Sequence, residues 1–150
     1  MGLLMAVVIL GGYYGLLRER IEPVAILSKV SSLDILDYYW VMALFISLAH
    51  SLLEEYYWRG FILSQLARWI PGTLALSLIA GFIFGIHHIF AMLSLFGWHI
   101  VAFCVLGTMA GGFVWSRMRL KGYSIWDCYI SHVFADLAIM WVGYDLLLRA

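Results

Sequence analysis

The chain has 150 residues, of which 65% are hydrophobic and 12% are charged, and its mean hydropathy is +0.96. A soluble domain carries about a quarter charged residues and a disordered one few apolar residues, so this composition excludes both classes. The nine basic and nine acidic residues balance to a net charge of zero, which argues against a nucleic-acid partner because phosphate binding requires concentrated lysine and arginine.

Long apolar segments predict an all-α fold, a polytopic transmembrane bundle of five to six helices in one domain over residues 1–150. A helix needs roughly 20 apolar residues to cross a bilayer, and most of the segments reach that length. In chain order, the expected helices are Gly2–Leu17, Leu36–Ile70, Thr73–Leu95, Trp98–Trp115 and Ile125–Leu148.

The connections between these helices follow from charge, proline and glycine. The mixed-charge stretch Arg18–Asp37 is the longest polar connection, and Pro71-Gly72 predicts a tight turn. The segment Leu36–Ile70 would extend about 52 Å as a straight helix, which is too long for one upright span. We therefore expect it to tilt, protrude or break, with Gly60 as the weakest point.

Two pairs of glycines at four-residue spacing predict close contacts between helices. Gly81 with Gly85 and Gly107 with Gly111 each place two small residues on one helix face. Such pairs let helix backbones approach closely in lipid.

Ionisable side chains occur in the middle of three of the predicted membrane helices. They are Glu54, Glu55 and Arg59 in the second helix, His87 and His88 in the third, and His132 and Asp136 in the last. Because ionisable groups are costly inside a bilayer, such residues mark candidate functional sites.

The depths of these residues in the membrane are compatible. Glu54 lies 17 residues before Pro71 and His88 lies 17 residues after it. Both are therefore about 25 Å from the same turn if the helices are unbroken. Counting from Gly122 on the same side of the membrane, His132 is about 15 Å deep. These groups can then meet in one polar pocket.

Helical spacing indicates which of these side chains share a face. Residues four apart lie on the same side of a helix, whereas neighbours point about 100° apart. His87 is therefore expected to face away from the site occupied by His88. The pairs expected to share a face are Glu55 with Arg59, Phe84 with His88, His132 with Asp136 and His50 with Glu54.

Three motifs follow one another on separate apolar helices: Glu54-Glu55-x-x-x-Arg59, Phe84-x-x-x-His88 and His132-x-x-x-Asp136. This ordered set resembles the CPBP family of CAAX proteases and bacteriocin-processing enzymes, also described as Abi proteins or intramembrane glutamic endopeptidases. The chain is shorter than the eight-helix members of that family and looks like a minimal-length member.

The resemblance implies an intramembrane endopeptidase with its catalytic core within residues 36–148. Glu54 with His88 would activate a water molecule, and His132 with Asp136 would stabilise the oxyanion. An ionised Asp136 cannot donate a hydrogen bond, so it is either protonated by burial or accepts a bond from His132; we favour the second. Glu55, Arg59, Phe84 and His50 would support the site.

Two alternatives remain open at the level of the sequence. The first is a zinc peptidase with Glu54, His88 and His132 as ligands, although no His-Glu-x-x-His motif preorganises a metal and no cofactor is expected. The second is a binding protein without catalysis, either a bacteriocin-immunity factor or a haem carrier that uses His88 and His132.

The expected partners are membrane lipids and a peptide or protein substrate that enters from the bilayer. In the family that the motifs resemble, substrates include prenylated tails, bacteriocin precursors and C-terminal sorting tails. The expected location is the cytoplasmic membrane of a prokaryote, with several membrane passes.

Overall fold

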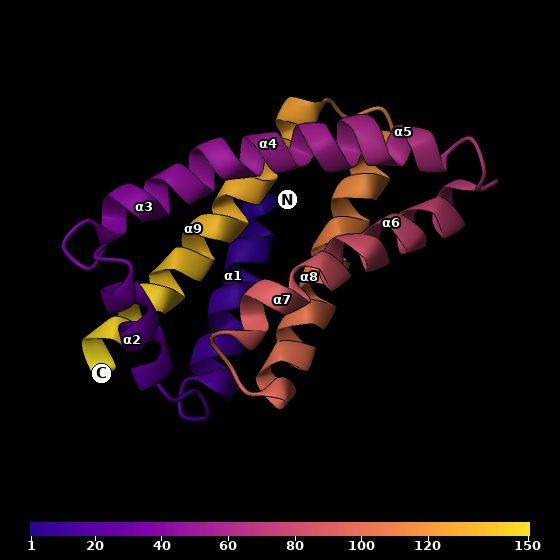
Figure 1. The fold of residues 1–150 in the computed structure, drawn as a ribbon. Helices are drawn as coiled ribbons and strands as arrows, with labels where there is room; N and C mark the ends of the chain where they lie inside the picture. Colours follow the sequence, from indigo (N-terminus) through magenta and orange to yellow (C-terminus); the bar gives the residue numbers. More distant parts are fainter. The chain divides into compact units, whose positions relative to one another are not determined.

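The chain forms helices and no strands in the computed structural model, which describes residues 1–150 (Figure 1). When consecutive helical segments are counted as one helix, the chain has six helices. This confirms the predicted all-α fold. The elements, with η for π-helical segments, are α1 Gly2–Gly12, η1 Tyr13–Leu17, α2 Val24–Ser32, α3 Tyr39–Phe45, η2 Ile46–His50, α4 Ser51–Glu55, η3 Tyr56–Ile62, α5 Leu63–Leu66, α6 Thr73–His87, α7 Ile89–Leu93, α8 Trp98–Leu120 and α9 Ile125–Arg149.

Three helices are long and apolar enough to cross a bilayer. They are Thr73–Leu93, Trp98–Leu120 and Ile125–Arg149, and the apolar helix Gly2–Leu17 is shorter. Their length and composition support the interpretation that the chain is an integral membrane protein. The five to six passes expected from the sequence stay a prediction.

Two compact units make up the chain. The terminal unit comprises Met1–Ser51 with Ile130–Ala150, and the central unit comprises Leu52–Tyr129. Of the motif residues, Glu54, Glu55, Arg59, Phe84 and His88 belong to the central unit, while His132 and Asp136 belong to the terminal unit.

In the terminal unit, α1 packs along the C-terminal part of α9 (Figure 1). A Cβ atom on Gly2 would lie 2.9 Å from the Ser131 Cα, so the two backbones approach closely. Near the end of this helix, the Tyr13 hydroxyl donates to Asp145 at 2.6 Å. Arg18 donates to the same carboxylate oxygen at 3.1 Å. Polar bonds therefore hold the far end of the first helix to α9.

The sequence does not predict α2, which lies inside the stretch Arg18–Asp37 that was expected to be a polar connection. This helix follows Pro23 and buries Ile26 and Val30. Those two residues are four apart, the spacing that places both side chains on one helix face. The charges on either side of such a short amphipathic segment conceal its pattern.

The helix from Tyr39 to Leu66 does not break at Gly60, although it departs from α-helical geometry there. The π-helical segments η2 and η3 widen the helix on either side of α4, and Gly60 lies within η3. π-Helical turns occur frequently at functional sites. Here they flank the short α-helical segment that ends in Glu54 and Glu55.

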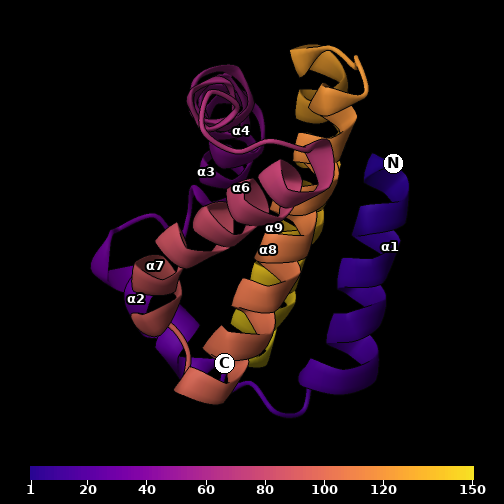
Figure 2. The same cartoon turned by 90° about the vertical axis from the view of Figure 1, so that its right-hand side faces the viewer.

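In the central unit, α6 crosses α8 at close range (Figure 2). A Cβ atom on Gly81 would lie 2.7 Å from the Met109 carbonyl oxygen, and one on Gly85 would lie 3.0 Å from the Met109 nitrogen. Larger residues at these two positions would push the helices apart. The contact surface predicted for Gly81 and Gly85 is therefore confirmed.

The matching surface of α8 differs from the prediction. Gly107 has nothing within 4 Å of a built Cβ atom, so it makes no such contact. Gly112 makes such a contact, because a Cβ atom there would lie 2.8 Å from the Phe84 ring. The predicted Gly111 is buried on the same helix. Phe84 is only 2% exposed. This packing fixes Phe84 against α8 and so fixes the end of α6.

Candidate active site

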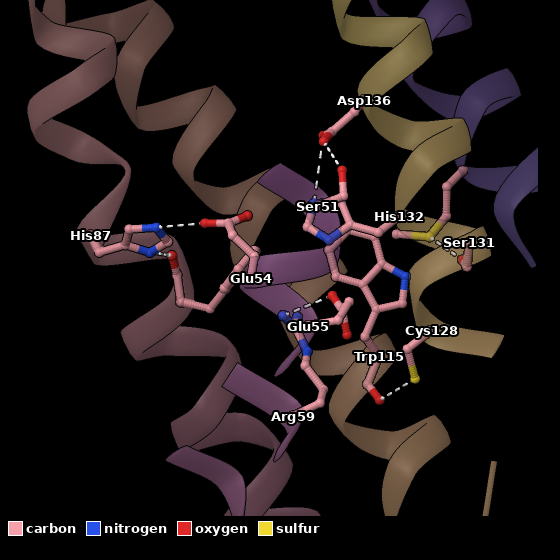
Figure 3. A network of polar contacts seen from close by, with 12 residues as sticks. Ser51, Glu54, Glu55, Arg59, His87, Trp115, Cys128, Ser131, His132 and Asp136 are labelled. Atoms are coloured by element: carbon pink, nitrogen blue, oxygen red, sulfur yellow. Dashed lines mark hydrogen bonds and ion pairs between the residues drawn. The ribbon is translucent and has the colours of Figure 1, made fainter. Parts of the chain in front are cut away.

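Glu54 lies beside His87 at the end of α6 (Figure 3), and the next residue, His88, is also close to it. Nε2 of His87 is 3.1 Å from Oε1 of Glu54. With His88 included, one nitrogen or oxygen atom from each residue lies within 4.8 Å of the others. Glu54 is only 8% exposed, and a carboxylate that is nearly buried needs polar partners. These residues form the Glu54–His87–His88 cluster.

A break at His88 explains why both histidines belong to this cluster. The His88 backbone N–H donates to the Gly85 oxygen at 3.2 Å, one residue nearer than the α-helical acceptor, which is Phe84. The Phe84 carbonyl oxygen instead faces the two imidazoles, at 2.5 Å from Nδ1 of His87 and 2.9 Å from Nδ1 of His88. The sequence predicts one unbroken helix over Thr73–Leu95, so this break is a correction.

The prediction that His87 faces away from the site is wrong. It assumes regular helix geometry, in which neighbouring side chains project about 100° apart. At the break, both rings reach the carbonyl oxygen of Phe84, and the centroids of the His87 and His88 rings lie 3.9 Å apart. His87 is therefore in direct contact with Glu54, and His88 belongs to the same cluster.

Trp58 covers the cluster with an aromatic surface. It lies one helical turn after Glu54, and its ring centroid is 4.8 Å from that of His87, with the two planes tilted by 32°. The same ring meets the edge of Phe84 at 5.5 Å. Trp58 is not among the residues predicted from the sequence, although its four-residue spacing from Glu54 is a usable signal.

Glu55 and Arg59 form the buried ion pair that their spacing predicts. Nη1 of Arg59 is 3.1 Å from Oε1 of Glu55, and the two side chains are 1% and 0% exposed (Figure 3). The guanidinium also lies 4.3 Å from the Phe84 ring centroid and 5.0 Å from that of Trp115. Such cation–π contacts add to the attraction of the charge pair. Arg59 therefore also stabilises the position of Phe84, whose carbonyl oxygen contacts both histidines.

In the terminal unit, His132 and Asp136 lie one turn apart on α9. Nε2 of His132 is 3.5 Å from Oδ1 of Asp136, and the Ser51 hydroxyl donates to Oδ2 at 2.5 Å (Figure 3). Ser51 is fully buried and His132 is 3% exposed. Asp136 thus accepts a hydrogen bond from Ser51.

Ser51 is not predicted from the sequence, and the reason is physical. A serine in a membrane helix ordinarily bonds a carbonyl of its own helix, and Ser51 does lie 2.9 Å from the Ser47 oxygen. Nothing in the local pattern indicates that the same hydroxyl reaches α9. The supporting residue predicted at His50 is exposed.

A carboxylate beside two imidazoles can do two kinds of chemistry. It can accept a proton from a water molecule that attacks a carbonyl. The same three groups can also be ligands of a divalent cation. In the central unit the possible metal ligands that lie together are Glu54, His87 and His88. The zinc site considered from the sequence has His132 in place of His87.

Comparison with known proteins identifies the family. The family model described as Type II CAAX prenyl endopeptidase Rce1-like matches residues 36–138, which is more than half of the chain. All three motifs lie within that range, from Glu54 to Asp136. No curated protein and no solved structure matches the chain. The chain therefore belongs to the Rce1-like type II CAAX prenyl endopeptidases, a protease family within the CPBP group that its motifs resemble.

Proposed function

We propose that the chain is an intramembrane endopeptidase in which Glu54 is the general base that activates water. The observation that supports this role is the Glu54–His87–His88 cluster, in which a nearly buried carboxylate lies 3.1 Å from an imidazole nitrogen. Peptide hydrolysis needs a base, a positioned water molecule and donors for the developing oxyanion. In this proposal, the cluster provides the base and positions the water molecule.

The proposed reaction is a direct attack by water. The water oxygen bonds to the carbonyl carbon of the scissile peptide as Glu54 takes one water proton. The carbonyl oxygen becomes the oxyanion of a tetrahedral intermediate. When the carbon–nitrogen bond breaks, Glu54 returns the proton to the leaving amine. His88 helps to position the water, and no metal ion is required.

His132 is the proposed donor to the oxyanion. Donors aimed at the place where charge develops are among the largest contributions to catalysis. Asp136 would fix the orientation of the His132 ring through the 3.5 Å contact, and Ser51 would in turn hold Asp136. This assignment rests on the motif pattern and on the membrane depth of these residues, estimated by counting residues along the helices.

The proposed substrate is a peptide segment at or within the bilayer of a prokaryotic cytoplasmic membrane. A prenylated C-terminal tail is the first candidate because the matching family model is described as a prenyl endopeptidase. A bacteriocin precursor and a C-terminal sorting tail are the other two. Each presents an extended peptide next to lipid.

The test uses the full chain in lipid vesicles and an internally quenched peptide that ends in a farnesylated CAAX sequence. We expect the wild type to cleave it and Glu54→Gln to lower kcat by about 1,000-fold or more, as expected for the loss of a general base. Glu19→Gln is the matched control because the Glu19 side chain is 79% exposed. Full activity of Glu54→Gln would overturn the proposal. Loss of wild-type activity with 1,10-phenanthroline, restored by zinc, would favour the zinc alternative.

A further inference from the structure

We infer that His87 is a positioning residue that orients the Glu54 carboxylate for attack by water, an inference that rests on the proposed function. His87 lies outside the three family motifs, which place a histidine only at position 88 of this helix. The inference therefore concerns a residue that the motifs do not include.

The orientation of the His87 ring is fixed from several directions. Nδ1 lies 2.5 Å from the Phe84 oxygen, the His88 ring centroid is 3.9 Å away and the Trp58 ring centroid is 4.8 Å away. A ring held in this way cannot turn without losing a hydrogen bond and two ring contacts. Its second nitrogen, Nε2, is consequently aimed at Glu54.

The two nitrogens of His87 each face an oxygen atom. These contacts limit which imidazole nitrogens can carry a proton. A neutral imidazole has one N–H group, whereas an imidazolium has two. Nδ1–H donates to the Phe84 carbonyl, which can only accept. The contact at 3.1 Å between Nε2 and Glu54 is then a hydrogen bond only when a proton lies between these two atoms. That bond engages Oε1 of the carboxylate.

The hydrogen bond to Oε1 restrains the plane of the carboxylate. Glu54 then takes the proton from the attacking water with its carboxylate already oriented, so this orientation does not have to be reached during the reaction. Effects of this kind appear in kcat rather than in substrate binding, because they act on the arrangement of the reacting groups. His87 acts through Glu54 and does not need to touch the substrate.

Three variants in lipid vesicles test this role with the same farnesylated peptide. We expect His87→Ala to lower kcat by about 10- to 100-fold, the effect of losing a hydrogen bond to a charged group. KM should change by less than about twofold. His87→Gln should recover much of kcat because its amide N–H can donate to Glu54. His99→Ala is the matched control, since His99 is an exposed histidine on α8.

The outcomes separate this inference from the proposed function. If Glu54→Gln is inactive but His87→Ala keeps the kcat of the wild type, the role of His87 is refuted and the role of Glu54 stands. Equal losses in His87→Ala and His87→Gln would also refute it, because hydrogen bonding would not matter. A loss explained by a lower thermal midpoint and a smaller folded fraction would assign His87 a purely structural role. If Glu54→Gln is active, both proposals fail.

Discussion

The Ser51 hydroxyl lies 2.5 Å from Oδ2 of Asp136, while Oδ1 of the same carboxylate lies 3.5 Å from Nε2 of His132. One oxygen of Asp136 therefore accepts a hydrogen bond and the other contacts an imidazole, so the carboxylate lies between the Ser51 hydroxyl and the His132 ring. An aspartate held in this way acts as an acceptor that orients a neighbouring ring. We therefore expect Ser51, which no family motif includes, to support catalysis through Asp136.

Ser51→Ala removes the donor to Asp136 and should leave the carboxylate free to rotate. We expect kcat to fall by about 10-fold, the lower range for a hydrogen bond to a charged group. Ser47→Ala is the matched control, because Ser47 is also buried and its hydroxyl has no hydrogen-bond partner. Steady-state cleavage by the two variants decides the point. Equal cleavage rates in the two variants would mean that Ser51 does not support catalysis.

Asp136→Asn tests whether Asp136 accepts or donates. The Ser51 hydroxyl donates to this carboxylate and the His132 ring contacts its other oxygen, whereas asparagine has only one oxygen. We therefore expect a loss of about 10-fold in kcat, measured with the quenched peptide. Wild-type activity of Asp136→Asn would instead mean that the side chain donates a hydrogen bond during the reaction.

The Glu55–Arg59 pair should matter for stability more than for chemistry. Removal of one partner leaves a buried charge without compensation, so Arg59→Met should cost about 3–5 kcal/mol of folding free energy. Replacing both residues at once, with Glu55→Leu and Arg59→Met, should recover most of that loss. Reversible unfolding in mixed micelles measures each variant. A double variant as unstable as the sum of the single variants would contradict a compensated ion pair.

Glycine at position 81 should be required by the crossing of α6 and α8. In Gly81→Val, the new side chain would overlap the Met109 carbonyl oxygen, which a Cβ atom alone would approach to 2.7 Å. We expect a lower thermal midpoint and lower activity, because the displaced helix carries both histidines. Gly107→Val is the control, since nothing lies within 4 Å of that position. Equal tolerance of both substitutions would argue against the close crossing.

The features that the sequence predicts are those with a local pattern. The Glu55–Arg59 pair follows from four-residue spacing, and the Gly81 and Gly85 contact follows from the same periodicity. The apolar segments also locate the main helices, since their lengths match what a bilayer requires. In each case the information lies within one helix.

The features that the sequence misses depend on contacts between segments. His87 joins the cluster because α6 ends at His88, and the spacing pattern assumes an unbroken helix. Ser51 reaches α9, a contact that its position in an apolar run does not indicate. The short helix α2 is concealed by the charges around it. Local patterns could not reveal these features, since each depends on where another part of the chain lies or where a helix ends.

The most direct test of the account is a double-mutant cycle between Glu54 and His132. If the base and the oxyanion donor act on one reaction, either single change, Glu54→Gln or His132→Ala, should remove most of the activity. Their combination should then be no worse than the more damaging single variant, because residues that act as a unit have strongly non-additive effects on kcat. Losses that multiply, or a Glu54→Gln variant that cleaves the peptide as well as the wild type, would contradict the account.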